Sequence, residues 1–282
     1  MTVRALLVGI NDYPSAPLRG CVPDVEAIWN ILIEEYAVNP DHVRLLLDQR
    51  ATKAAVLVRL RWLLEQSVPG DVALFWFSGH GSQVRDRDGD ELKDNKDELL
   101  VTADKEWWLD PLTDDHLRRE FKAQKEGVSL YVVLDCCHSG SGTRSISPGQ
   151  GHGLRTDPQN GLLLPFADRF CPPPLDIWYR EYGRELPVNR VGVKQDDVGE
   201  IRHVLIAGCK ADQTSADAQM CGGWRGALSY YFQEKNRAGR PLDETMDSVR
   251  DSLKRNGFSQ EPQIEGPEHM LAAPFLTPWE EQ

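Results

Sequence analysis

Apolar residues follow two different rhythms along the chain. Short runs rich in Val, Leu and Ile predict buried β-strands at residues 3–10, 42–47, 71–79, 130–135 and 203–208. The stretches between and after them repeat apolar residues at helical spacing and predict helices at residues 24–37, 52–67, 113–125, 226–236 and 242–257. Continuous apolar strands that alternate with amphipathic helices are typical of an α/β protein whose mostly parallel sheet is covered on both faces.

A region rich in Gly, Pro and Ser breaks this alternation at about residues 138–200. It contains the stretches SGSGTRSISPGQGHG and CPPP, which predict a long irregular connection. Connections of this length in compact domains are usually functional or disordered. We therefore expect a single domain over residues 1–282, with a larger N-terminal region to about residue 140, an irregular linker over 141–200 and a smaller C-terminal region over 201–282.

Composition and charge narrow the classes of function. The chain has 282 residues, of which 40% are hydrophobic, which is enough for one domain with a large core. A net charge of −12 argues against nucleic acid or an anionic membrane as a partner and favours a basic substrate. The apolar run in MTVRALLVGIND is too short for a signal peptide or a membrane span. We expect a cytoplasmic protein, most simply a monomer.

Two predicted strands end in residues that carry chemistry. One strand runs into Ser78–Gly81 with the letters SGHG, and another runs into residues 135–140 with the letters DCCHSG. If these strands are parallel neighbours, His80 and Cys137 meet at the same edge of the sheet. A thiolate is the reactive form of cysteine, and a nearby imidazole can activate the thiol. The flanking glycines allow a substrate backbone to approach and supply N–H groups for an oxyanion.

The two adjacent cysteines are distinguished by the alternation of side chains along a strand. Asp135 and Cys137 share one face, whereas Cys136 points to the other. We therefore interpret Cys137 as the nucleophile and Cys136 as a packing residue. The alternative is that both thiols fill the core, as most buried cysteines do. The chain has six cysteines but no CxxC pair and no spacing typical of a zinc site.

Four motifs together resemble the metacaspases, the caspase-like cysteine peptidases of bacteria, protists, fungi and plants. They are LRGCVPD at 18–24, SGHGSQ at 78–83, DCCHSGSG at 135–142 and GCKADQTSADA at 208–218. The QAC signature of animal caspases is absent, and the chain looks most like bacterial, type I-like members of the family (orthocaspases). The resemblance implies a caspase–haemoglobinase-like α/β/α sandwich with a His80/Cys137 dyad. It also points to an oxyanion held by the N–H groups of Gly81 and Cys137.

The resemblance also implies which residue precedes the cut. Metacaspases cleave after Arg or Lys, and their acidic first pocket falls here on Cys21, Asp24, Ser78 and Asp135. Two carboxylates in one pocket favour a cation, which a guanidinium can supply with paired hydrogen bonds. An Asp substrate would add a third negative charge. The alternative for Asp24 is that it caps the N-terminus of the helix that follows.

Calcium is the one cofactor that the resemblance raises. Residues 84–98 are rich in carboxylates, but Glu91 stands where an EF-hand loop needs Gly. The calcium ligands of the family fall on Asp97, Asp114 and Asp115, whereas the fourth ligand position holds Arg144. A cation at that position weakens calcium binding, so we expect no required cofactor. The alternative is an acidic, solvated loop followed by a charged helix N-terminus.

The sequence thus predicts a cysteine endopeptidase that acts on proteins or peptides after Arg or Lys. Basic residues in the linker are tethered close to the site, so self-cleavage is expected there. The candidates, which the sequence does not rank, are Arg144, Arg155, Arg169, Arg180, Arg184, Arg190 and Lys194. Two other classes stay open. One is a catalytically weak scaffold or binding module, and the other is a redox sensor that uses Cys136 and Cys137, against which a strained eight-membered ring argues.

Overall fold

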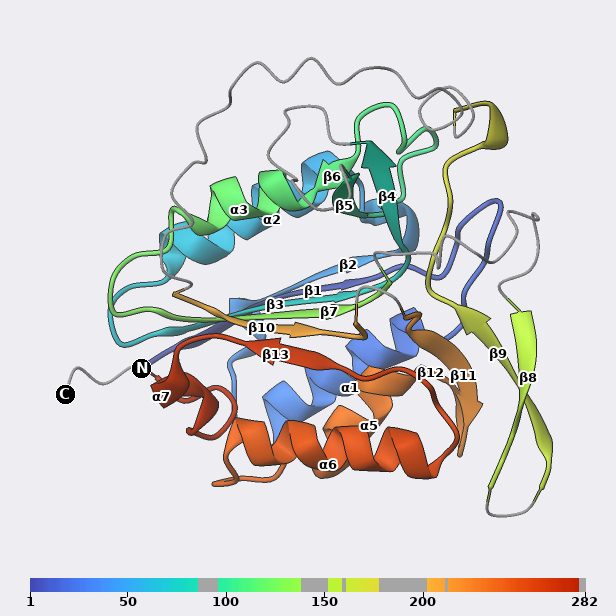
Figure 1. Ribbon diagram of the computed structural model, residues 1–282. Coiled ribbons are helices and arrows are strands. Elements are labelled where there is room, and N and C mark those ends of the chain that lie inside the picture. The colour runs from blue at the N-terminus through green and yellow to red at the C-terminus, as the bar shows by residue number, and fades with distance from the viewer. Residues whose placement is uncertain (86–95, 138–151, 159–160, 178–201, 211–212, 279–282) are drawn as a thin grey trace.

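A six-stranded sheet forms the centre of the protein in the computed structural model (Figure 1), which describes residues 1–85, 96–137, 152–158, 161–177, 202–210 and 213–278. The strand order is β13-β10-β7-β3-β1-β2. Five strands are parallel: β1 (Val3–Gly9), β2 (Val43–Leu47), β3 (Val72–Ser78), β7 (Ser129–Asp135) and β10 (Val204–Ala207). The edge strand β13 (Gln263–Glu265) runs antiparallel to β10.

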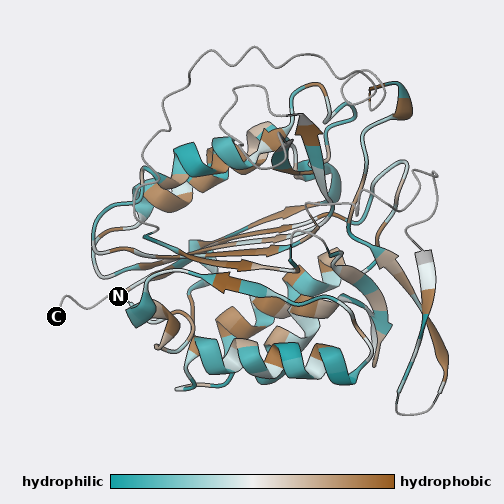
Figure 2. Ribbon diagram, in the orientation of Figure 1, coloured by the Kyte–Doolittle hydropathy of each residue, from teal (hydrophilic) through white to brown (hydrophobic). Residues whose placement is uncertain are grey.

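Helices cover both faces of this sheet. On one face lie α1 (Cys21–Glu34), α5 (Ala227–Lys235) and α6 (Leu242–Arg255), and on the other lie α2 (Lys53–Gln66) and α3 (Asp114–Phe121), as Figure 1 shows. Each face has its own buried apolar cluster between sheet and helices. The central strands are hydrophobic and the outer helical faces are polar (Figure 2). The predicted fold class, an α/β/α sandwich with a mostly parallel central sheet, is confirmed.

The main elements begin and end close to where the apolar pattern places them. All seven residues of β3 and all seven of β7 are buried, which is why both read as continuous apolar runs. Helix α1 is the informative exception, because it begins at Cys21 rather than at residue 24. Its N-cap is Gly20, and Asp24 lies in its first turn. The alternative that Asp24 caps this helix is therefore wrong.

Two smaller antiparallel sheets are absent from the sequence prediction. One contains β4 (Gly81–Arg85), β5 (Lys96–Leu100) and β6 (Leu112–Thr113). The other contains β8 (His152–Thr156), β9 (Leu163–Asp168), β11 (Ala216–Met220) and β12 (Gly223–Gly226). We call β8 and β9 together the hairpin; it lies beside β11 and β12 at one end of the central sheet (Figure 1).

The hairpin corrects the prediction of a wholly irregular connection over residues 138–200. Glycine and proline interrupt the strand pattern at Gly153, Pro158 and Pro165, and the strand that pairs with β9 follows about fifty residues later. Pairing with β11 is therefore a tertiary effect that the local pattern does not reveal. Within the connection, residues 138–151, 159–160 and 178–200 lie outside the described residues.

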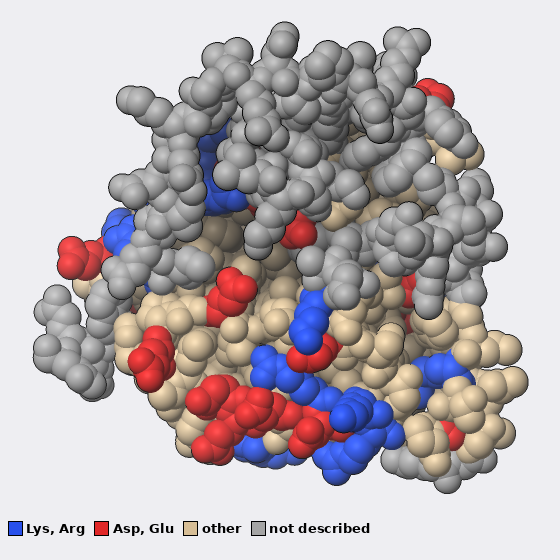
Figure 3. Space-filling view, in the orientation of Figure 1, with Lys and Arg blue, Asp and Glu red and all other residues tan. Residues whose placement is uncertain are grey.

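The remaining elements are short or peripheral. They include the 3₁₀ turns η1 (Pro40–His42) and η2 (Asp48–Arg50) and the helix α7 (Glu268–Leu271). Acidic and basic side chains intermingle on the face of the molecule where α6 lies (Figure 3), and Arg250 of α6 pairs there with Asp247 at 2.7 Å. Among the helices in the described parts of the chain, none combines the length and the apolar character needed to cross a bilayer.

Candidate active site

The carboxyl ends of β3 and β7 bring the two sequence motifs together. These strands are parallel neighbours, and Ser78 lies opposite Asp135 in their register. The chain segments that follow, with Gly81 and Cys137, approach so closely that a Cβ atom on Gly81 would lie 1.9 Å from the Cys137 carbonyl oxygen. Only glycine allows this approach. The last glycine of the SGHG motif is therefore required for steric reasons.

The His80 side chain is oriented by residues that follow β1. Its backbone N–H donates to the Tyr13 hydroxyl at 3.1 Å, and the two rings stack at a tilt with centroids 4.6 Å apart. Its Nε2 lies 2.7 Å from the Ala16 carbonyl oxygen. Because a carbonyl only accepts, Nε2 carries the hydrogen and Nδ1 keeps its lone pair. Nδ1 is buried and, within the described chain, has no hydrogen-bond partner. A free basic nitrogen is what a general base requires.

The Cys137 thiol is buried and faces Ser215. Its Sγ accepts a hydrogen bond from the Ser215 N–H and lies 3.4 Å from the Ser215 carbonyl oxygen. Burial raises the pKa of the Cys137 thiol well above its usual value and lowers the pKa of His80 to about 4. No hydrogen bond joins these two described side chains, and burial favours the neutral form of each. Cys136 instead lies in the apolar cluster beneath α2 and α3.

A buried arginine from the end of the hairpin fills the acidic pocket. The Arg169 side chain is fully buried, and its Nη2 donates to Asp24 Oδ2 at 2.8 Å and to Asp217 Oδ1 at 2.9 Å. Its Nη1 donates to Ser78 Oγ at 2.7 Å and to the Asp135 carbonyl oxygen at 3.0 Å, and lies 3.1 Å from Asp135 Oδ2. One guanidinium thus contacts three carboxylates, which satisfies the charge requirement of a buried cation.

The carboxylates of the pocket are themselves held in place. Asp135 Oδ1 accepts from Ser215 Oγ at 2.7 Å, and Asp135 Oδ2 accepts from the N–H of Ser229 at 3.0 Å in the first turn of α5. The positive end of that helix favours a carboxylate there. Asp24 Oδ1 accepts from Arg225 Nε at 2.8 Å. Burial nevertheless raises the pKa of Asp24 to about 6, although Arg169 opposes this shift.

The backbone of Arg169 is bound as closely as its side chain. Its carbonyl oxygen accepts from the N–H of Gly81 at 2.9 Å and from the N–H of Cys137 at 3.2 Å, while its own N–H donates to the Ser215 carbonyl at 2.9 Å. Further along, the N–H of Cys171 donates to the Gly81 carbonyl at 3.0 Å. After β9 the chain bends at Arg169 and forms a bridge between Phe170 and Gly81, with the Arg169 carbonyl pointing at two N–H donors. This is the geometry that an oxyanion hole offers to a scissile carbonyl.

The four pocket residues expected from the sequence all lie around this guanidinium. Asp24, Ser78 and Asp135 contact it directly, and Cys21 lies close enough for Arg169 to lower its pKa against a larger rise from burial. Sequence reasoning missed four further residues: Tyr13, Ser215, Asp217 and Arg225. Of these, Ser215 and Asp217 stand in the motif GCKADQTSADA, where the second acidic residue was a signal that was not used.

The self-cleavage candidates divide into three groups. Arg169 lies in the acidic pocket, whereas Arg155 donates to the carbonyl of Asn256 at 3.1 Å, next to the end of α6. The other candidates lie outside the described residues: Arg144, Arg180, Arg184, Arg190 and Lys194. Among the described basic residues of this region, only Arg169 has its carbonyl on the N–H groups of Gly81 and Cys137.

Two of the three carboxylates named for calcium are bound by a basic side chain. Asp97 and Asp115 line one cavity of about 180 Å³, together with Arg119. Asp114 and Asp115 are both bound by Arg118, at 2.8 and 2.9 Å. In the part of the chain that the structure describes, no three His, Cys, Asp or Glu side chains converge as metal ligands. Calcium prefers six to eight oxygen ligands, so the described donors alone do not complete a calcium site; residues 86–95 and Arg144 lie outside the described chain.

An α/β/α sandwich with His80 and Cys137 directly after two neighbouring parallel strands is the arrangement expected of a caspase-like protein. Residues 3–144 match the family model "Metacaspase, peptidase C14 domain". The chain belongs to the metacaspase family.

Individual relatives agree with the family assignment. Over 93% of the chain, it is 29% identical to Metacaspase-1B of Neurospora crassa, 30% to Metacaspase-1 of Eremothecium gossypii and 30% to Metacaspase-1A of Aspergillus oryzae. The alignments span 66%, 63% and 67% of those relatives' lengths. A crystal structure of a protein from Geobacter sulfurreducens has a similar fold, with a TM-score of 0.68 and 21% identity, covering 99% of this chain and all of that one.

Proposed function

We propose that the protein is an endopeptidase that cleaves after Arg or Lys through a dyad of His80 and Cys137. One observation carries this proposal. The guanidinium of Arg169 lies among three carboxylates while its carbonyl oxygen accepts from the N–H groups of Gly81 and Cys137. The same residue thus occupies the specificity pocket and the place of a scissile carbonyl, as a substrate would.

The chemistry follows from the groups around that carbonyl. For catalysis the Cys137 thiol turns from Ser215 toward the carbonyl carbon and gives its proton to Nδ1 of His80. The thiolate attacks the carbon, and the charge that develops on the oxygen is stabilised by the two N–H donors. The imidazolium then protonates the leaving amine as the C–N bond breaks, which leaves a thioester on Cys137. Water, deprotonated by His80, hydrolyses the thioester to a carboxylic acid and restores the thiol.

The charge balance of the pocket sets the specificity in this proposal. When Arg169 is absent from the pocket, Arg225 is the remaining cation among the described residues that pairs with these carboxylates, and of Asp24, Asp135 and Asp217 it pairs with Asp24. The pocket then carries excess negative charge in a buried place, and Arg or Lys relieves it. An acidic side chain in the same place would raise the repulsion.

Self-processing is part of the proposal, with the Arg169–Phe170 bond as its site. Cleavage there yields residues 1–169 and 170–282. The fragments stay associated because β10 of the second pairs with β7 of the first, in the middle of one sheet. Its support is the bound geometry of Arg169, which no other described candidate shares.

A catalytically weak scaffold is the second candidate. One observation favours it. Among the described contacts, the Cys137 thiol is hydrogen-bonded to the backbone of Ser215 and not to His80. In this alternative the hairpin is a permanent part of the fold, and Arg169 is never exchanged for another substrate.

Fluorogenic peptides that differ only in the residue before the cut separate these candidates. Wild type should hydrolyse the Arg and Lys peptides and leave the Asp peptide intact, and Cys137→Ala and His80→Ala should be inactive while folded. Each assay is run with calcium and with a chelator, and we expect similar rates because Arg144 stands at a ligand position. A folded wild type that hydrolyses none of these peptides supports the scaffold, and a preference for Asp contradicts the pocket assignment.

A further inference from the structure

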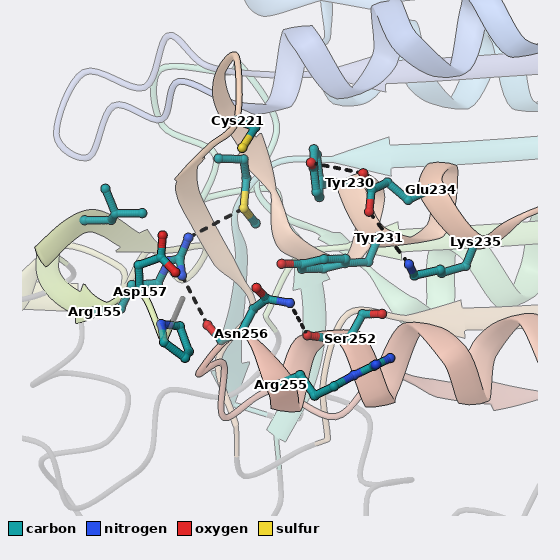
Figure 4. Close-up of a pocket in the computed structure, with 13 residues that line it drawn as sticks. Arg155, Asp157, Cys221, Tyr230, Tyr231, Glu234, Lys235, Ser252, Arg255 and Asn256 are labelled. Carbon is teal, nitrogen blue, oxygen red and sulfur yellow. Dashed lines mark hydrogen bonds and ion pairs between the residues drawn. The ribbon is translucent and has the colours of Figure 1, made fainter. Parts of the chain in front are cut away.

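The hairpin is poorly buried compared with the rest of the domain. Leu154, Leu162 and Leu163, in or next to its strands, are 63%, 59% and 60% exposed. A cavity of about 630 Å³ separates the hairpin from α5 and α6, lined on the hairpin side by Arg155, Asp157 and Leu164, among others (Figure 4). Apolar burial holds the hairpin mainly at the end next to Arg169, where Ala167 is buried and Phe166 packs against the core. Elsewhere its position depends on a small number of polar contacts.

Arg155 makes the polar contacts at the far end of the hairpin. Its Nη1 donates to the carbonyl of Asn256 at 3.1 Å, and its Nη2 donates to the carbonyl of Gln219 at 3.1 Å (Figure 4 shows the Asn256 contact). The guanidinium also lies 4.5 Å from the centroid of the Phe258 ring. Asn256 is the C-cap of α6, where the negative end of the helix attracts a cation. Arg155 thus links β8 to both α6 and β11.

The near end of the hairpin is held by strand pairing. Residues 166–168 of β9 pair with residues 216–218 of β11, and Thr214 Oγ1 donates to Asp168 Oδ1 at 2.9 Å. The hairpin residues that make these contacts all precede the Arg169–Phe170 bond in the chain. The same holds for Arg155 and for the side chain of Arg169. Cleavage of that bond removes none of them. It adds a carboxylate at Arg169, one oxygen of which can stay on the N–H groups of Gly81 and Cys137.

We propose that the hairpin remains docked after self-cleavage as a tethered competitor for the active site, and that Arg155 is the positioning residue that sets how tightly it is held. This inference rests on the proposed function. A tethered product competes at high effective concentration, so only the fraction of molecules with the hairpin released can bind another substrate. The apparent KM then rises with the strength of docking, whereas kcat is unchanged.

The test compares self-cleaved wild type with Arg155→Gln, using a fluorogenic peptide that has Arg before the cut. Arg155→Gln should lower KM by about 3- to 10-fold at unchanged kcat, the size expected when the net loss is one hydrogen bond of ordinary strength at a partly exposed site. Arg155→Lys should fall between the two. The matched control is Arg237→Gln, because Arg237 likewise donates to a carbonyl at a helix end, Asn236 at 2.8 Å, but lies away from the hairpin. It should leave KM unchanged.

Hydrogen exchange gives a readout that does not depend on activity. In the inactive Cys137→Ala background, adding Arg155→Gln should speed exchange of the amides of β8 and β9, whereas adding Arg237→Gln should not. If wild type hydrolyses no Arg peptide, the proposed function fails, whatever the exchange result. If wild type is active but Arg155→Gln leaves both KM and hairpin exchange unchanged, or raises KM, the competitor inference is wrong and the proposed function stands.

Discussion

Two carboxylate–arginine clusters lie at opposite ends of the central sheet, and they differ in charge balance. At the amino ends, Asp71 pairs with Arg4 at 2.6 Å and also accepts from the N–H of Thr2 at 2.7 Å. At the carboxyl ends, three carboxylates surround Arg169. The first cluster contains one charge of each sign, Arg4 in β1 and Asp71 directly before β3. The second sets three carboxylates against Arg169 and Arg225, so it keeps excess negative charge, and this excess grows if Arg169, the residue after the hairpin, leaves.

The ionisation of the two clusters shows the same difference. Burial acts to raise the pKa of Asp71, but the hydrogen bonds from Arg4, Thr2 and Val68 outweigh it and lower the pKa overall. For Asp24 burial dominates, and its pKa rises to about 6 despite Arg169. Asp71 is thus arranged to be charged within the fold. For Asp24, burial makes the charged form less favourable than it is in water. Ionisable groups in such places are often retained for function.

The largest predicted effect concerns the dyad beside the second cluster. Cys137→Ala and His80→Ala should each lower the cleavage of Arg peptides by about 10³-fold or more, because each removes a group that acts on the reacting carbonyl. Cys136→Ala should keep most activity, because that thiol lies in the apolar cluster beneath α2 and α3. The measurement is kcat/KM for each folded variant. Equal losses in Cys136→Ala and Cys137→Ala would contradict the assignment of the nucleophile.

The next largest predicted effect concerns the cleavage of Arg peptides, which should depend on the carboxylates around Arg169 and not on Asp71. Asp135→Asn and Asp217→Asn should each lower kcat/KM for Arg peptides by about 30-fold, or roughly 2 kcal/mol, since each leaves the substrate cation short of a charged partner. Asp71→Asn is the matched control at the other end of the sheet and should leave kcat/KM unchanged. A normal kcat/KM in Asp217→Asn would show that this residue, which the sequence did not point to, is not part of the pocket.

The smallest predicted effect concerns stability and pH. The contribution of Asp71 is present above its ordinary pKa of about 4 and is lost as the pH falls through its lower folded pKa. For Asp24 the sign is opposite, because its folded pKa of about 6 lies above the unfolded value. The folded state then binds more protons, so this residue lowers the free energy of unfolding as the pH rises from about 4 to about 6.

Denaturant unfolding measures this contrast directly. At pH 7, Asp71→Asn should lower the free energy of unfolding by about 1 kcal/mol, whereas Asp24→Asn should leave it unchanged or raise it, because Asn resembles the neutral form. Asp24→Asn should also reduce the slope of stability between pH 4 and 6. A larger loss of stability in Asp24→Asn than in Asp71→Asn would contradict the difference between the clusters.

Much of the fold was predictable because its signals are local. The strands β3 and β7 are buried on both faces, so their apolar runs are continuous, and parallel pairing then brings His80 and Cys137 to one edge. The contacts that build the rest of the site are tertiary. Asp217 reaches the pocket through the pairing of β11, and Tyr13 contacts His80 across 67 positions in the chain.

The choice among the basic residues of the connection was also beyond the sequence. Their charges are equivalent, and nothing in the local pattern distinguishes Arg155 from Arg169. The pairing of β9 with β11 distinguishes them, because it places the Arg169 carbonyl on the N–H of Gly81, whereas Arg155 lies at the end of α6. A carbonyl can be placed on two N–H donors only by strand register, which depends on segments far apart in the chain.

The most direct test of the central claim is the mass of the fragments formed by the purified protein. Wild type and Cys137→Ala are incubated in parallel, and samples taken over time are analysed by intact-mass spectrometry. We predict that wild type yields a fragment that ends at Arg169 and one that begins at Phe170, and that Cys137→Ala stays whole. First cleavage at another basic residue, with the Arg169–Phe170 bond intact, would contradict the claim that Arg169 lies in the pocket as a substrate.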